Sequence, residues 1–371
     1  MDEKKTANTT VIELMIFFLT AYGIQFLLGM PLMIRQYIAP VVFAGFMGVL
    51  PAAGALLARQ YKKEDISENK RVRNVVIGVG VIYLVMILLH IVGIIKNSDD
   101  KMTYYITQAA TMIGSIMIVG RARVDKKEGK LFDQFESVKK VIFLWVLLLA
   151  VSNLVSSLSS FSTTFTTMIL FLILMPLQFI SSAVGYFGEE YGWRGYLQEK
   201  MQHQFGKRLG VILLGVLWEL WHMPLWFTAY DLKLWEIPFR FAAAISMSVF
   251  LGYIFMRTKN VWICSLVHCI YNILVSTVPT VAATVQTTVA KSRIWTGIQV
   301  SPSKTIIIKA VMEIMLIIVM ASFLFAKEYR RDVNNSEQLC RDSAALPEDF
   351  GVNVCNAGKT DDQDKRKQRE E

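Results

Sequence analysis

Two adjacent carboxylates, Glu189 and Glu190, follow directly after the long apolar run 161–187. Charged groups at membrane depth are costly, and they are usually paired and functional. Arg194 comes four residues after Glu190, so on a helix these two side chains share a face and form an ion pair. Glu189 points about 100° away around the helix axis and need not share that partner. The pattern therefore predicts one carboxylate that is held structurally and one that is free to accept a proton.

A histidine interrupts the apolar segment 209–227 downstream. His222 is not needed for crossing a membrane, and Pro224 loosens the backbone two residues later. Glu219, three residues before His222, could accept its imidazole N–H and fix the tautomer, as carboxylates commonly do behind a working imidazole. Trp218, four residues before His222, could form an aromatic wall. We therefore expect this segment to present a polar face with one oriented imidazole.

A second histidine occurs with an asparagine in the apolar segment 261–281. His268 and Asn272 are four residues apart and share a helix face. The asparagine side chain supplies both a donor and an acceptor, and beside a histidine it can donate to a developing oxyanion, as acyl transfer requires. Taken alone, each histidine is equally well explained as a hydrogen-bonded core residue, and Asn272 as a contact between helices. The joint occurrence of the three patterns favours a hydrolytic site.

Membrane helices must carry these residues. The chain has 371 residues, of which 54% are hydrophobic, and its mean hydropathy is +0.42. Several uncharged runs reach the roughly 18 to 25 residues that cross a bilayer. The basic residues behind the net charge of +9 lie mainly in short loops, where they set orientation in the membrane, so we expect no nucleic-acid partner. The four cysteines show neither metal-ligand spacing nor a disulfide framework.

We predict an all-α, polytopic bundle of ten transmembrane helices in the cell membrane, the first of them retained and not cleaved. Connections rich in lysine and arginine alternate with poorer ones, which places both termini in the cytoplasm, and an even number of spans agrees with that. A short amphipathic helix is expected over 194–208, lying in the cytoplasmic interface. The predicted spans are 11–34, 37–58, 74–95, 102–120, 141–158, 165–187, 209–227, 238–256, 261–281 and 305–326.

Three regions follow from this pattern. Residues 1–140 hold the first four spans and basic loops, and residues 141–326 form a catalytic membrane domain with its motifs within 183–275. Residues 327–371 are highly charged and nearly free of aromatic residues, so they bury too little apolar area to order themselves, and we predict a disordered cytoplasmic tail.

The three motifs, in this order on separate helices, resemble the CPBP family. These are the CAAX-processing and bacteriocin-processing intramembrane proteases, also called the Abi or type II CAAX prenyl endopeptidase family. The resemblance covers about 183–275, roughly a quarter of the chain. The family usually has phenylalanine where this sequence has Trp218, a departure that changes pocket shape more than chemistry. The matching residues are Glu189, Glu190, Arg194, Trp218, His222, His268 and Asn272.

The resemblance implies hydrolysis of a peptide bond by a water molecule activated beside Glu189. By the same resemblance, His222 would help to hold the water or a metal, and His268 with Asn272 would stabilise the oxyanion. The ion pair between Glu190 and Arg194 would hold the geometry of the first motif. The substrate would be a membrane-associated peptide in the lipid bilayer, either a CAAX-like, lipidated peptide or a bacteriocin-like one.

The sequence leaves two mechanisms open. Glu189, His222 and His268 would make three protein ligands for a catalytic zinc with a bound water. Alternatively, Glu189 acts as a base without a metal, in which case His268 binds the oxyanion. Either mechanism requires the side chains of Glu189, His222 and His268 to lie close together. They do so if the helix ending at 187 continues through Arg194, or if the 209–227 span starts late or tilts.

A second class of function also fits the composition. A non-catalytic membrane transporter, or a bacteriocin self-immunity protein, would bind a peptide without cleaving it and would keep its phenotype in a Glu189→Gln variant. The sequence has no internal repeat, which argues against a transporter built from inverted repeats.

Overall fold

The computed structural model describes residues 2–64, 70–98, 100–121, 131–158, 161–279, 281 and 302–330. The described part of the chain is helical and contains no strand, which confirms the all-α class. The chain divides into two units, Met1–Glu328 and Tyr329–Glu371. Almost all of the predicted tail 327–371 lies outside the described residues, so its disorder remains a prediction.

The helices coincide with the apolar runs of the sequence, and their ends lie at charged or helix-breaking residues. Pro40 begins α3 at a position where its missing N–H costs nothing. The Asn260 side chain caps α12 by accepting from the N–H groups of Trp262 and Ile263 at 2.8 and 3.3 Å. The helices are α1 (Asp2–Phe18), α2 (Ile24–Ile34), α3 (Pro40–Tyr61), α4 (Lys70–Ile91), α5 (Lys101–Arg121), α6 (Lys139–Ser156), α7 (Phe161–Gly192), α8 (Glu199–Phe205), α9 (Lys207–Trp221), α10 (Met223–Trp226), α11 (Ile237–Thr258), α12 (Val261–Asn272) and α14 (Pro302–Ser322).

Eight helical segments of the described residues are long and apolar enough to cross a membrane, so this is a multi-pass membrane protein. They correspond to eight of the ten predicted spans. The span predicted over 209–227 ends at Trp221, because Pro224 cannot continue the helix, and the chain restarts as the short α10. The span predicted over 261–281 is a shorter apolar helix, Val261–Thr277. Within the described ranges, the count of ten is therefore corrected to eight full-length spans and two shorter helices.

The amphipathic helix predicted over 194–208 is present in part as α8, and it is continuous with α7. The chain continues from α7 through a π-helical turn, Trp193–Gln198, into α8, so that Phe161–Phe205 is one helical segment of 45 residues. Arg194 and Gln198 are fully buried in this turn, whereas an interfacial helix would expose its polar residues. Glu189 consequently lies well inside a long helix, which satisfies the condition under which the three motifs can meet.

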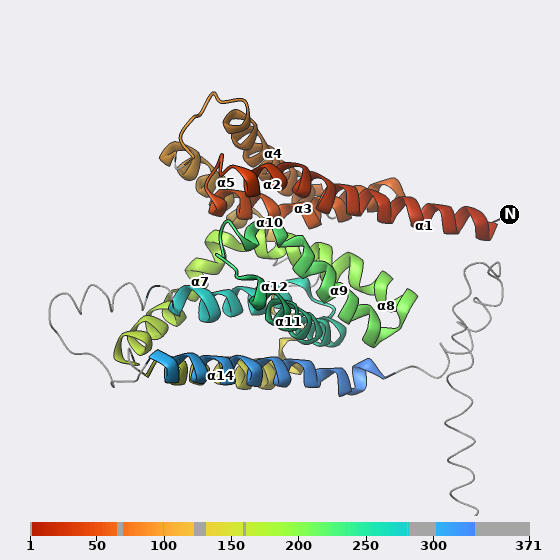
Figure 1. Ribbon diagram of the computed structural model, residues 1–371. Helices are drawn as coiled ribbons and strands as arrows, with labels where there is room; N and C mark the ends of the chain where they lie inside the picture. Colours follow the sequence, from red (N-terminus) through yellow and green to blue (C-terminus); the bar gives the residue numbers. More distant parts are fainter. Residues whose placement is uncertain are drawn as a thin grey trace, which may run out of the picture. The chain divides into compact units, whose positions relative to one another are not determined.

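Helix α7 forms the centre of the first unit (Figure 1) and packs against α3, α5 and α12. Its crossing with α3 is very close, because a Cβ atom on Gly188 would overlap the carbonyl oxygen of Gly48. Gly192 approaches Pro51 in the same way. Small residues that let two backbones approach are typical of helix contacts in membranes. This crossing fixes the part of α7 that carries the paired carboxylates.

The first span contacts α9 through its own π-helical turn, Leu19–Gly23. The Tyr22 hydroxyl donates to the carbonyl of Leu217 at 2.6 Å, and Gln25 Nε2 donates to the carbonyl of Trp221 at 2.8 Å. The last carbonyls of a helix have no partner within the helix. Gln25 therefore satisfies a carbonyl at the open end of α9, immediately before His222, and Tyr22 adds a contact one turn earlier.

Candidate active site

A buried polar group joins α7 to α11 and α12. Glu190 is fully buried, and its Oε2 accepts from Arg194 Nε at 3.0 Å, which is the predicted ion pair. Glu190 Oε1 lies 2.9 Å from His268 Nδ1. Arg194 Nη1 donates to the Ser248 hydroxyl on α11 at 3.1 Å. An ion pair out of water needs such additional hydrogen bonds, and these bonds also orient His268.

Glu189 lies outside this pair, as its angular position on the helix predicts. Its side chain is half-buried, and its Oε2 accepts from the indole N–H of Trp218 at 3.1 Å. No hydrogen bond to Oε1 occurs among the described residues. Glu189 therefore has one oxygen fixed by an uncharged donor and one available to another group.

Trp218 lies between the two imidazoles. Its ring centroid is 5.3 Å from that of His268, with the planes perpendicular, and 5.7 Å from that of His222. The Arg194 guanidinium lies over the same indole at 5.4 Å, where the electron-rich face attracts a cation. One side chain thus contacts both histidines and the arginine of the first motif while donating to Glu189.

The orientation of His222 follows from its backbone contact. His222 Nδ1 lies 2.8 Å from the carbonyl oxygen of Trp218. A carbonyl only accepts, so Nδ1 carries the proton, and the neutral ring presents the Nε2 lone pair as an acceptor. The remaining nitrogen of His222 can therefore hold a water hydrogen.

Asn272 lies at the same place as Tyr186, a residue that sequence reasoning missed. The Tyr186 ring packs edge-on against His268 at 5.3 Å, and its hydroxyl interacts with the Asn272 side chain. Tyr186 precedes Glu189 by three residues and Glu190 by four. That spacing places it on their face of α7 and was the available signal. The structure thus brings Glu189, His268 and Asn272 around one tyrosine.

The role predicted for Glu219 is wrong. Its Oε1 accepts from Trp226 Nε1 at 2.8 Å and from Arg240 Nε at 3.0 Å, and its Oε2 accepts from Arg240 Nη2 at 3.2 Å. The guanidinium fork matches a carboxylate with two parallel bonds, so it outcompetes an imidazole. His222 lies just past the end of α9 and turns back to Trp218 instead. Arg240, a basic residue in the apolar run of α11, was the overlooked signal.

The three residues predicted to bind zinc do not form a ready ligand set. A structural or catalytic zinc takes ligands at about 2.0–2.3 Å in a tetrahedral arrangement. Within the ranges that the structure describes, no three His, Cys, Asp or Glu side chains are grouped to hold a metal ion. The Trp218 indole contacts the rings of both His222 and His268 and donates to Glu189. We therefore derive no step through a metal, and zinc binding remains a prediction.

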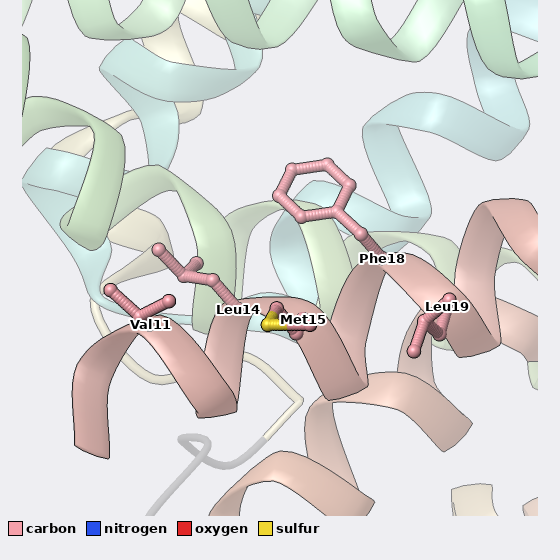
Figure 2. Close-up of a pocket in the computed structure, with 5 residues that line it drawn as sticks. All are labelled: Val11, Leu14, Met15, Phe18 and Leu19. Atoms are coloured by element: carbon pink, nitrogen blue, oxygen red, sulfur yellow. The ribbon is translucent and has the colours of Figure 1, made fainter. Parts of the chain in front are cut away.

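The hollow drawn in Figure 2 lies away from these residues, on α1. It has a volume of about 390 Å³. Three of its lining side chains are more than half exposed, and none is polar. Such a surface suits lipid chains and offers no group for chemistry. It is lined by Val11, Leu14, Met15, Phe18 and Leu19.

The protein is therefore a multi-pass helical membrane protein with a polar site inside its helix bundle. The carboxylates, imidazoles and amide of this site come from separate helices. Residues 171–274 match the family described as "Type II CAAX prenyl endopeptidase Rce1-like". This matched segment contains all three motifs.

One curated relative is similar over part of the chain. The CAAX prenyl protease 2 of Methanococcus maripaludis is 34% identical over 105 residues, which is 28% of this chain and 34% of that protein. The match thus spans about a third of the curated relative's length. No solved structure matches the chain.

Proposed function

We propose that the protein is an intramembrane endopeptidase that hydrolyses a peptide bond with a water molecule activated by Glu189. The observation that supports this most directly is the division of labour between the two carboxylates. Glu190 is occupied by Arg194 and His268, whereas Glu189 accepts one N–H from Trp218. A carboxylate free of cationic partners, and bonded to an indole that contacts two imidazoles, is suited to accept a proton.

The proposed reaction uses this chain's own side chains. Glu189 takes one proton from the water, and His222 Nε2 accepts a hydrogen bond from the other O–H. The water oxygen attacks the carbonyl carbon of the peptide bond. The carbonyl oxygen becomes an oxyanion, to which the Asn272 amide and the Nε2–H of His268 in its protonated form donate, while the Glu190 carboxylate accepts from Nδ1–H of the same ring. Glu189 then returns its proton to the leaving nitrogen as the C–N bond breaks. The hydroxyl proton that remains on the new carboxylic acid then passes to the amine, so the products are a carboxylate and an ammonium group.

The Glu190–Arg194 pair acts in this scheme by orientation. Glu190 holds the Nδ1 edge of His268, so the Nε2 edge points away from the pair and is available to substrate. A site held by such supporting contacts needs less rearrangement when the reaction occurs. A bound zinc, if the side chains rearranged around it, would supply a Lewis acid for the carbonyl and the water. Metal analysis of the purified protein tests that prediction.

The substrate class follows from where the site lies. The carboxylates and imidazoles are on helices within the bundle, so we propose a peptide that is itself associated with the membrane. The name of the Methanococcus maripaludis relative states a prenylated CAAX substrate for that protein. We propose a peptide of the same general kind here, with an apolar or lipidated segment next to the scissile bond.

Cleavage in isotopically labelled water tests this function. Purified protein in detergent is incubated with a peptide whose cysteine near the C-terminus is prenylated, and with the same peptide lacking the lipid, in H₂¹⁸O. We expect cleavage of the lipidated peptide with one ¹⁸O atom in the new carboxylate, as measured by mass spectrometry. Binding of the peptide without any product would support the non-catalytic alternative and overturn the proposal.

Replacing Trp218 by phenylalanine tests the contact to Glu189. Phenylalanine keeps an aromatic ring between the histidines but removes the N–H that Glu189 accepts. The family that the sequence resembles usually has phenylalanine at this position, but in this chain Glu189 accepts the indole N–H. Hydrogen bonds to charged groups contribute about 1.5–3 kcal/mol, so we expect kcat of this protein to fall roughly tenfold while KM changes little. Trp226→Phe is the matched control, because its N–H donates to Glu219 instead. An unchanged kcat in Trp218→Phe would show that this bond does not position Glu189.

A further inference from the structure

Arg59 on α3 contacts the first motif although it lies outside the matched segment 171–274. Its Nη1 donates to the Tyr191 hydroxyl at 2.7 Å, and its Nη2 donates to the carbonyl of Gly195 at 2.6 Å. The guanidinium also lies over the Tyr191 ring at 5.0 Å. Its side chain is only 11% exposed. The two acceptors flank Arg194 in the sequence, so one planar fork spans the residue that pairs with Glu190.

The backbone at this point is unusual in a way that Arg59 compensates. Trp193–Gln198 are π-helical, so backbone hydrogen bonds join residues five apart and the regular α-helical ladder is interrupted. A carbonyl that loses its partner inside a protein costs about 1–3 kcal/mol. Gly195 lies in this turn, and its carbonyl accepts from Arg59. The arginine therefore stabilises the widened turn itself.

The contact does not serve merely to attach α3 to α7. That attachment is made by the glycine crossing, where Gly188 and Gly192 meet Gly48 and Pro51 of α3. Arg59 is about two turns further along α3 than Pro51, at 3.6 residues per turn. The hydrogen bonds of Arg59 are directional and reach one side chain and one carbonyl of the motif. They therefore fix the rotation of the π-helical turn about its axis as well as its distance from α3.

We propose that Arg59 is a positioning residue for the peptidase reaction: its fork locks the π-helical turn that carries Arg194, and through Arg194 and Glu190 it orients His268. The path consists of contacts of 2.6 to 3.0 Å, from Arg59 to Gly195 and from Arg194 through Glu190 to His268. The significance for catalysis rests on the function proposed above. The orientation of His268 is a property of the protein whether or not it cleaves peptides.

Arg59→Lys is the test variant. Lysine keeps the positive charge but, as a single ammonium group, lacks the fork that satisfies both acceptors at their present geometry. We expect kcat for the lipidated peptide to fall about tenfold, KM to stay within about twofold, and the melting temperature to change little. Arg257→Lys is the matched control, because that arginine pairs with Glu328 at 3.2 Å outside the motif. The control should behave as the parent.

A second readout is independent of cleavage. The chain has four histidines, so ¹⁵N-labelled imidazole signals of His268 can be assigned by single replacements. We expect these signals to shift in Arg59→Lys and to stay in place in Arg257→Lys. An unshifted His268 signal would overturn the proposal even if activity fell. If the parent cleaves no peptide, the proposed function fails, while the imidazole signals still decide whether Arg59 orients His268. If Arg59→Lys lowers the melting temperature clearly and the fall in kcat is explained by the smaller folded fraction, Arg59 contributes to folding alone.

Discussion

Glu189→Gln should lose peptide cleavage by about 10²-fold to 10⁴-fold, the usual contribution of a positioned general base. The amide has nearly the same shape as the carboxylate, and its oxygen can still accept the Trp218 N–H. It cannot take a proton from water, so the chemical step fails while the fold remains. Initial rates with the lipidated peptide measure the chemical step, and the melting temperature measures the stability of the fold.

Glu199→Gln provides the comparison for that experiment. Glu199 lies on α8, its side chain is 57% exposed, and it pairs with Lys259 at the surface. Exposed pairs contribute about 0–1 kcal/mol, so this variant should cleave at the parental rate and melt at nearly the same temperature. Parental activity in Glu189→Gln would show that another group takes the proton, and the proposed mechanism would be wrong.

Gly188→Ala should destabilise the protein strongly, although alanine is the better helix former. The added Cβ would overlap the carbonyl of Gly48 and lie 3.1 Å from the Cα atom of Val49. Both obstacles are backbone atoms, which cannot rotate away as a flexible side chain would. Overpacking of this kind costs about 1–3 kcal/mol, and here it acts on the crossing that positions the carboxylates. We expect a clearly lower melting temperature and reduced cleavage.

Gly185→Ala is the matched substitution, since it lies three residues earlier on α7. A Cβ there meets nothing within 4 Å, and replacing glycine by alanine in a helix favours folding by about 1 kcal/mol. This variant should therefore melt at or above the parental temperature. Thermal unfolding in detergent, followed by near-ultraviolet circular dichroism, measures both. Equal melting temperatures for the two variants would contradict the close packing of α3 on α7.

The parts of the structure that follow from local rules were predictable from the sequence. Apolar length identified eight full-length spans because a span must cover the bilayer core. The Glu190–Arg194 pair followed from its four-residue spacing, since helical geometry alone brings such side chains together. The separation of Glu189 from that pair followed from the same geometry. Pro224 signalled the backbone change at His222, although we did not foresee that α9 ends there.

Contacts between distant segments could not be read in this way. Glu219 has two candidate partners on physical grounds, and the choice of Arg240 over His222 depends on how α11 lies beside α9. From the sequence, the continuation of α7 through Arg194 was only a condition, because Glu189, Glu190 and Arg194 resemble a polar helix end. In the structure Glu190 and Arg194 are buried and paired with each other. Tyr186 was missed because a tyrosine in an apolar run is usually explained by packing alone.

The hydrogen bonds from Tyr22 and Gln25 to α9 limit how far this chain can be truncated without losing its fold. The stretch recognised by family similarity begins at residue 171, so it excludes both donors. Expressed by itself, it would leave the Trp221 carbonyl at the end of α9 without its donor, in an environment where lipid offers no substitute. The folded unit that carries the three motifs is therefore larger than the stretch recognised by similarity, and a minimal excised version should retain at least the first span, Thr10–Ile34.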